Sequence, residues 1–124
     1  MDVALKITKE QVQGKVAITV FHLRGWLDAQ SEEQLLAEAR AEYDAGARFL
    51  LINLDEVNML TSAGIRAIQK VYKLFTPEQE RYKIARVKLC MAPPQVYHVL
   101  GVTGFLQSVQ NYETMQAAVD SFEE

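Results

Sequence analysis

The stretch FLLINLDEVNMLTSAGIRAIQKVYKLF, residues 49–75, decides the fold. It opens with the apolar run of residues 49–54, which is short for a helix and is followed by charge. Such a run indicates a strand covered on both faces in the middle of a sheet. Apolar side chains then recur at helical spacing from Ile65 to Phe75, which predicts an amphipathic helix that ends at Thr76-Pro77.

The segments on either side alternate between strand and helix patterns. We expect strands at residues 3–8, 16–23, 86–91 and near 106–109, and helices at residues 31–43, from Pro93-Pro94 to about Gly104, and at 113–122. A turn containing Gly14 joins the first two strands, and residues 24–28 are expected to be irregular. The sequence therefore predicts an α/β fold in a single domain, residues 1–124. Its mixed β-sheet of four to five strands opens with a hairpin and is backed by about four α-helices.

Composition limits the classes of partner. The chain of 124 residues is 49% hydrophobic and 23% charged, as a globular domain is, and its net charge of -3 comes with scattered Lys and Arg residues. This pattern gives no basic surface for nucleic acid. No apolar run approaches the roughly 18 residues that span a bilayer, and no signal pattern begins the chain. We therefore expect a cytoplasmic protein that binds neither nucleic acid nor a membrane. The single cysteine, Cys90, lies in an apolar run and is expected to be a buried thiol.

The expected turn at residues 55–64 is the leading candidate for a functional site, because it leaves the carboxyl end of the most buried strand. The hydroxyl of Thr61 or Ser62 can accept a hydrogen bond from the free N–H groups of the first helical turn, so either residue can cap the helix. The same N–H groups and the positive end of the helix dipole can hold a phosphate on Ser62, which they would stabilise by about 0.3 to 1 kcal/mol.

Catalytic patterns are missing from the sequence. Ser62 lies in Thr-Ser-Ala-Gly and not in a Gly-x-Ser-x-Gly elbow, and the two histidines, His22 and His98, are expected to be structural or surface residues. There is no Gly-rich phosphate loop, no Cys and His cluster and no carboxylate pair at metal-binding spacing. We therefore predict neither an enzyme nor a bound cofactor or metal. A receiver-like domain phosphorylated on Asp55 is an alternative, but the paired acids that would hold its magnesium are lacking.

Three motifs resemble those of one family. Residues 53–66, NLDEVNMLTSAGIR, resemble the signature of STAS domains, the bacterial anti-sigma factor antagonists. In that signature a hydrophobic strand and a short turn precede Asp-Ser-Ser-Gly-Leu or a variant such as Ser-Ser-Ala-Gly-Leu-Arg. Gly25-Trp26-Leu27-Asp28 resembles the family's Gly-Glu-Leu-Asp, and residues 99–105, VLGVTGF, resemble its Leu-x-x-x-Gly-Leu segment. The motifs stand in the family's order over nearly the whole chain.

The resemblance implies a switch and not an enzyme. Such a protein binds an anti-sigma factor of the histidine-kinase-like ATPase type and so frees the sigma factor; that partner phosphorylates a serine, and a phosphatase restores it. Ser62 takes the phosphorylated position, and Asp28 matches an acidic residue that lies close to that serine in the family. Thr61 stands where many antagonists carry Asp, so Thr61 is a second candidate acceptor. A non-phosphorylated scaffold in a larger signalling assembly is the alternative function.

The expected partner surface surrounds this serine. We expect the partner-binding residues to be Asp28, Asp55, Thr61, Ser62, Gly64, Arg66, Lys70 and Lys73. The three cations lie on the outward face of the helix and would suit an acidic helix of the partner. Trp26 is expected in the core, and an exposed aromatic anchor at the interface is the alternative. A phosphate adds about -1.5 to -2 charges to a turn that already carries acids, so like-charge repulsion would release a partner fitted to a neutral hydroxyl.

Overall fold

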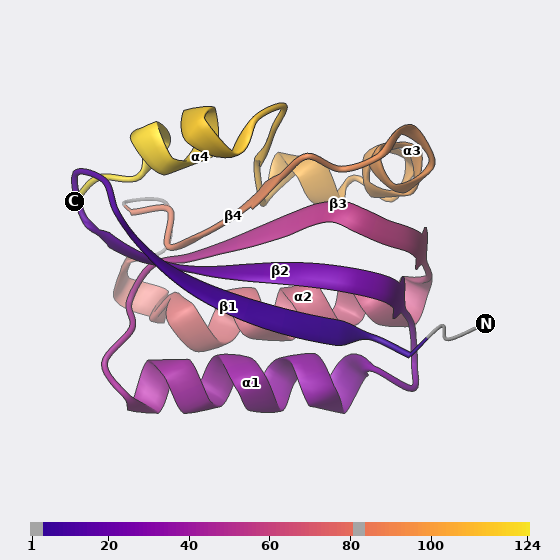
Figure 1. Ribbon diagram of the computed structural model, residues 1–124, viewed down its shortest axis with the longest axis horizontal. Helices are drawn as coiled ribbons and strands as arrows, with labels where there is room; N and C mark the ends of the chain where they lie inside the picture. Colours follow the sequence, from indigo (N-terminus) through magenta and orange to yellow (C-terminus); the bar gives the residue numbers. More distant parts are fainter. Residues whose placement is uncertain (1–3, 81–83) are drawn as a thin grey trace.

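The computed structural model describes residues 4–80 and 84–124 of the chain (Figure 1). The strands are β1 (Lys6–Gln13), β2 (Ala17–Leu27), β3 (Leu50–Leu60), β4 (Val87–Cys90) and β5 (Asn111–Tyr112). The α-helices are α1 (Glu32–Asp44), α2 (Ser62–Phe75), α3 (Pro94–Val102) and α4 (Met115–Ser121), and short 3-10 helices lie at η1 (Glu78–Glu80) and η2 (Phe105–Gln107). The predicted α/β class is confirmed.

The described strands form one mixed sheet in the order β1-β2-β3-β4-β5. β1 and β2 make the predicted antiparallel hairpin, which turns where the N–H of Gly14 donates to the carbonyl of Val16 at 3.0 Å. From β2 onward, neighbouring strands run parallel. The apolar run thus forms the first half of β3 at the middle of the sheet, as predicted. An opening hairpin also separates this fold from a receiver domain, which has a helix after its first strand.

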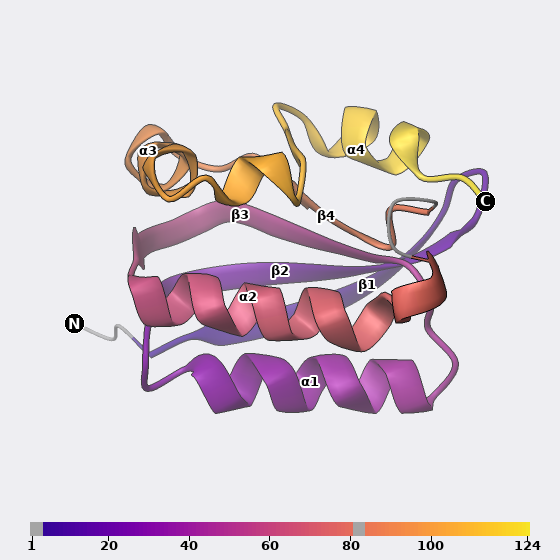
Figure 2. The same cartoon turned by 180° about the vertical axis from the view of Figure 1, so that it is seen from behind.

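Helices cover both faces of the sheet. α1 and α2 lie side by side along one face (Figures 1 and 2). The buried side chains of α2 share the larger core with Phe21 of β2 and Ile52 of β3. On the opposite face, Val119 of α4 shares a smaller core with Ile18 and Leu51. Because both faces of β3 meet apolar side chains, the near-continuous apolar sequence of its first half is explained.

The predicted ends of the two central strands were wrong. β2 continues to Leu27, through most of the segment expected to be irregular, and β3 continues to Leu60, into the expected turn. The two strands pair over this length with register shifts between His22 and Arg24 and between Gly25 and Trp26. In β3 these irregularities place two exposed residues between buried ones, at residues 55–56 and 58–59, so the pattern of its second half does not look like strand.

The ends of the chain also differ from prediction. β1 lies at Lys6–Gln13 and not at residues 3–8, of which residue 3 falls outside the described part of the chain. This strand pairs on one side only, and edge strands carry exposed charges that hide the apolar pattern. The strand expected near residues 106–109 is replaced by η2, and β5 follows at Asn111–Tyr112. α4 begins at Met115 after a Thr114 cap, two residues later than expected.

Candidate functional site

The neighbouring hydroxyls of Thr61 and Ser62 have different roles at the start of α2. Thr61 has an extended backbone (φ -107°, ψ 173°), and its Oγ1 accepts from the N–H of Gly64 at 3.3 Å, so Thr61 is the N-cap. Its carbonyl accepts from the N–H of Ile65 at 3.0 Å, which begins the helical ladder. Ser62 is the first helical residue and is exposed, and its hydroxyl makes no hydrogen bond within the described part of the chain. The cap is therefore Thr61, and Ser62 presents an available hydroxyl to solvent.

The first turn of α2 rests on the end of β2. The N–H of Thr61 donates to the carbonyl of Leu27 at 3.2 Å. Gly64 comes so close to the same residue that an added Cβ would lie 2.2 Å from the Leu27 oxygen and 2.8 Å from Cδ1 of Leu60. Only a glycine fits there, so Gly64 fixes how closely the helix start approaches the strand end.

Asp28 follows directly after this contact and shapes the loop into α1. Its Oδ1 accepts from the N–H of Gln30 at 3.1 Å, from the N–H of Ser31 at 3.3 Å and from the Ser31 hydroxyl at 3.2 Å. The Ser31 hydroxyl also donates to the carbonyl of Trp26 at 3.1 Å and is buried. Asp28 is half-buried and directly follows Leu27, whose carbonyl contacts the start of α2.

The cations of α2 are only partly as predicted. Arg66 and Lys70 are exposed on the outward face, but both pair with Glu32 in the first turn of α1: Arg66 Nε lies 3.4 Å from one carboxylate oxygen, and Lys70 donates to the other. The hydrogen bond from Lys70 holds the pKa of the Glu32 carboxyl below its usual value, although partial desolvation opposes this, and Arg66 adds a smaller attraction. Lys73 is exposed and has no ion pair among the described residues. The outward face of α2 therefore also joins the two helices.

Asp55 lies away from Ser62, although both were expected to belong to one turn. It is exposed at the midpoint of β3, which continues from there to Leu60. At the usual rise of a strand, Asp55 lies about 15 Å from the end of β3. Burial raises the pKa of the Cys90 thiol to about 12, and the charge of Asp55 adds to this rise.

Two apolar side chains near Ser62 were missed or misplaced by sequence reasoning. Trp26, expected in the core, is half-exposed and belongs to neither core cluster. It pairs across the strands with Met59, whose side chain is 37% exposed. The signal in the sequence was that both flank buried leucines, Leu27 and Leu60, so the alternation of a strand turns them outward.

The remaining reactive groups lie away from Ser62. His22 Nε2 is 2.8 Å from a carboxylate oxygen of Glu10 across the hairpin, and His98 is exposed on α3, so both are surface residues as expected. Cys90 is fully buried, which confirms the expected position of the thiol. Within residues 4–80 and 84–124 no group of three His, Cys, Asp or Glu side chains is placed to hold a metal ion.

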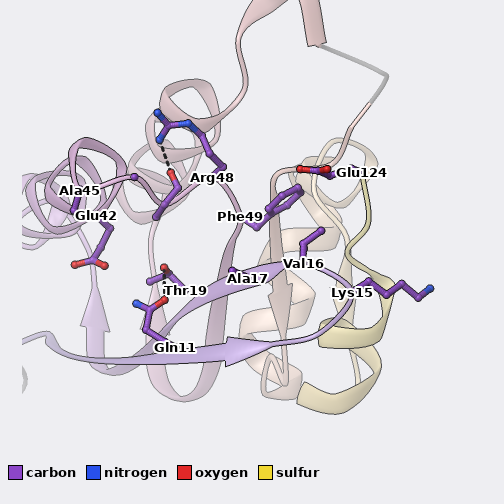
Figure 3. A pocket seen from close by; sticks show the side chains of 12 residues that line it. Gln11, Lys15, Val16, Ala17, Thr19, Glu42, Ala45, Arg48, Phe49 and Glu124 are labelled. Carbon is purple, nitrogen blue, oxygen red and sulfur yellow. Dashed lines mark hydrogen bonds between the residues drawn. The ribbon is translucent and has the colours of Figure 1, made fainter.

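A hollow at the opposite end of the sheet is a weaker candidate for the functional site (Figure 3). It lies between the hairpin and the segment that joins α1 to β3, where the parallel strands begin. Its central polar side chains are already paired with the protein, since the hydroxyl of Thr19 donates to Gln11 at 3.2 Å and Arg48 donates to the carbonyl of Tyr43 at 2.9 Å. The start of α2 therefore remains the candidate site.

Comparison with known proteins identifies the family. A profile of the STAS domain matches residues 9–118. The chain belongs to the STAS domain family. This STAS domain is 28% identical over 118 residues to BtrV of Bordetella bronchiseptica, which is named as an anti-sigma factor antagonist, and the match covers 95% of each chain. The resemblance seen in the three sequence motifs is thus confirmed.

Solved structures show the same fold. A crystal structure of an anti-sigma factor antagonist from Mycobacterium paratuberculosis has a TM-score of 0.82 at 18% identity and covers 100% of this STAS domain and 98% of its own chain. The Bacillus cell fate determinant SpoIIAA in its phosphorylated form has a TM-score of 0.65 at 19% identity, with coverage of 93% and 97%. These relatives are named for antagonism of a regulatory protein and not for a reaction, in agreement with the prediction that this chain is not an enzyme. Within the described residues, every helix falls short of the length and hydrophobicity needed to cross a bilayer.

Proposed function

We propose that this STAS domain is an anti-sigma factor antagonist whose binding is controlled by phosphate on Ser62. The unphosphorylated domain binds an anti-sigma factor of the histidine-kinase-like ATPase type; the partner phosphorylates Ser62 and dissociates, and a phosphatase restores the hydroxyl. The name of BtrV supports the class of partner. The observation that carries the proposal is the exposed Ser62 hydroxyl, which has no hydrogen bond within the described residues.

Ser62 suits a kinase better than Thr61 does. A hydroxyl that attacks ATP must enter a kinase active site, and the exposed first residue of a helix can do so. The Thr61 hydroxyl is half-buried and accepts from the Gly64 N–H, so its phosphorylation would disrupt the cap. We therefore assign Ser62 as the acceptor and Thr61 as the residue that holds its backbone.

Charge explains how phosphorylation releases a partner. A phosphoserine carries about -1.5 to -2 charges at neutral pH. Two acidic side chains lie on segments that contact α2: Asp28, which directly follows Leu27, and Glu32, which pairs with Arg66 and Lys70. A partner surface that packs against a neutral Ser62 would bury this added charge beside acids, which costs several kcal/mol.

The surface around Ser62 also supplies binding energy. The half-buried Trp26 and the exposed Met59 form an apolar pair at the ends of β2 and β3, and Lys73 extends the charged face of α2. Aromatic and methionine side chains are enriched at the centres of protein interfaces. We propose that the partner covers Ser62 together with this pair.

The test measures affinity and phosphorylation with purified anti-sigma factor ATPases of the source cell. Calorimetry compares the full chain with Ser62→Ala, Ser62→Asp and the control Ser108→Asp, which adds the same charge to an exposed serine near the other end of α2. We expect Ser62→Ala and Ser108→Asp to bind within about twofold of the parent. Ser62→Asp should bind at least about tenfold more weakly, equal to about 1.4 kcal/mol. With ATP, mass spectrometry should find one phosphate, lost in Ser62→Ala.

Equal affinities of Ser62→Ala and Ser62→Asp for a bound ATPase would refute the switch. If, in addition, no phosphate appears on Ser62 or Thr61, the domain is a non-phosphorylated scaffold. That alternative keeps the same binding surface and removes its regulation.

A further inference from the structure

Arg66 stands one helical turn after Ser62 on the same side of α2. In a helix, residues i and i+4 are neighbours, and side chains lean toward the amino end. The Arg66 side chain therefore leans toward the turn that carries Ser62. An acidic group placed four residues before a basic one is the more favourable order of such a pair.

Glu32, which pairs with Arg66 in the structure, has a second and closer cation in Lys70. Glu32 is 13% exposed and uses one carboxylate oxygen for Lys70 and the other for Arg66, whose Nε lies at 3.4 Å. The Lys70 hydrogen bond is the largest cause of the lowered pKa of the Glu32 carboxyl, and the contributions of Arg66 are smaller. Arg66 itself is 55% exposed. The contact of Arg66 with Glu32 is thus the longer of the two, and Lys70 would still pair with Glu32 if Arg66 turned away.

We propose that Arg66 binds the phosphoryl group of phosphorylated Ser62, turning from Glu32 while Lys70 keeps Glu32 in place. The inference rests on the proposed function in that Ser62 is the residue phosphorylated. Guanidinium and phosphate form charge-assisted, often bidentate hydrogen bonds that are stronger than a single contact to a carboxylate at 3.4 Å.

The other charged groups around Ser62 favour this exchange. Asp28, in the loop after β2, and Glu32, on α1, would both repel a phosphate. Lys70 lies about 12 Å farther along the helix axis than Ser62 and is held by Glu32. Arg66 is therefore the cation best placed to neutralise the new charge.

The exchange gives phosphorylation a second effect on the partner surface. Unphosphorylated, the outward face of α2 presents Arg66 as a partly free cation beside Ser62. Phosphorylated, the same guanidinium is occupied within the domain. A partner that uses an acidic group against Arg66 then loses an ion pair at the moment it meets the phosphate.

The test uses the full chain with phosphoserine installed at position 62 by genetic encoding. Phosphorus NMR titrations give the second pKa of the phosphoserine, ordinarily about 6, in the parent, in Arg66→Gln and in Lys73→Gln. Lys73 is the matched control, because it is an exposed cation of the same helix about 16 Å beyond Ser62. We expect Arg66→Gln to raise this pKa by about 0.3 or more, a twofold loss of dianion stabilisation, and Lys73→Gln to leave it within about 0.1.

A second measurement guards against indirect effects. In the parent chain the Nε–H resonance of Arg66 should move when phosphate is present on Ser62, and Arg66→Lys should restore part of the pKa shift. Equal pKa values in Arg66→Gln and Lys73→Gln, with an unmoved Arg66 resonance, would overturn the proposal. Because the phosphate is encoded, this result does not depend on a kinase. If the ATPases ignore Ser62 but the pKa shift appears, only the proposed function fails.

Discussion

Gly64→Ala gives a sharp test of how α2 meets the sheet. The added methyl would lie 2.2 Å from the carbonyl oxygen of Leu27, 2.9 Å from its carbonyl carbon and 2.8 Å from Cδ1 of Leu60. Two of these atoms belong to the backbone of β2, so the clash cannot be relieved by a side-chain rotation. The first turn of α2 must move away from the strand.

The magnitude follows from three effects. Overpacking a tight site costs about 1 to 3 kcal/mol. Displacing the turn weakens the hydrogen bond from the Gly64 N–H to Thr61, and losing such a cap costs about 1 kcal/mol. Alanine gains about 0.5 to 1 kcal/mol over glycine in a helix, which opposes both. We expect a net loss of about 2 kcal/mol in the free energy of unfolding.

Gly101→Ala is the matched control. Gly101 lies in α3, and an added Cβ there meets no atom within 4 Å. The same chemical change should therefore stabilise the chain, by about 0.5 kcal/mol. Urea unfolding followed by circular dichroism compares both variants with the parent. A Gly64→Ala chain as stable as Gly101→Ala would show that the close approach to Leu27 does not constrain the helix start.

Three further outcomes test the site and its surroundings. Thr61→Ala should lower the free energy of unfolding by about 1 kcal/mol through loss of the cap to Gly64, whereas Thr61→Ser should keep most of it; equal urea midpoints for the two would contradict the cap. Native Cys90, whose pKa is raised to about 12, should react with a thiol reagent at pH 8 about a thousandfold more slowly than the unfolded chain, and comparable rates would exclude the buried thiol. The lowered pKa of Glu32 contributes stability above the usual carboxyl pKa of 4.5 that is lost as the pH falls through the folded pKa. Glu32→Gln should therefore flatten the acid side of the stability curve, as urea titrations between about pH 2 and 6 would reveal.

The sequence predicted the elements whose pattern is set by burial. The run at residues 49–54 is covered on both faces, so its composition alone located β3. The face of α2 from Ile65 to Phe75 is buried at a helical period, so its pattern and its end before Pro77 were clear. In both segments burial determines which positions are apolar, so the hydrophobic pattern of the sequence identifies the element directly.

What the sequence could not predict depends on neighbours far along the chain. Asp55 was predicted to begin a turn because the residues around it do not show that β3 continues to pair with β2 as far as Leu60. Arg66 and Lys70 were predicted to be free cations on the outward face. The helical period shows which face a residue lies on, but it does not show which helix packs beside that face. The position of Glu32 opposite them is set by the packing of α1 against α2, which follows from the order of the strands.

The choice between Thr61 and Ser62 shows how one residue of backbone geometry assigns two similar side chains to different roles. Both are small hydroxyls at a helix start, and either could cap it; the extended backbone of Thr61 places its Oγ1 toward the Gly64 N–H, whereas Ser62 is already helical and points to solvent. A cap requires only an acceptor, and threonine and aspartate both supply one. Thr61 therefore supplies the acceptor of the cap without adding a negative charge beside Ser62. With that charge absent, Arg66 can meet a phosphate without a competing carboxylate in the preceding position.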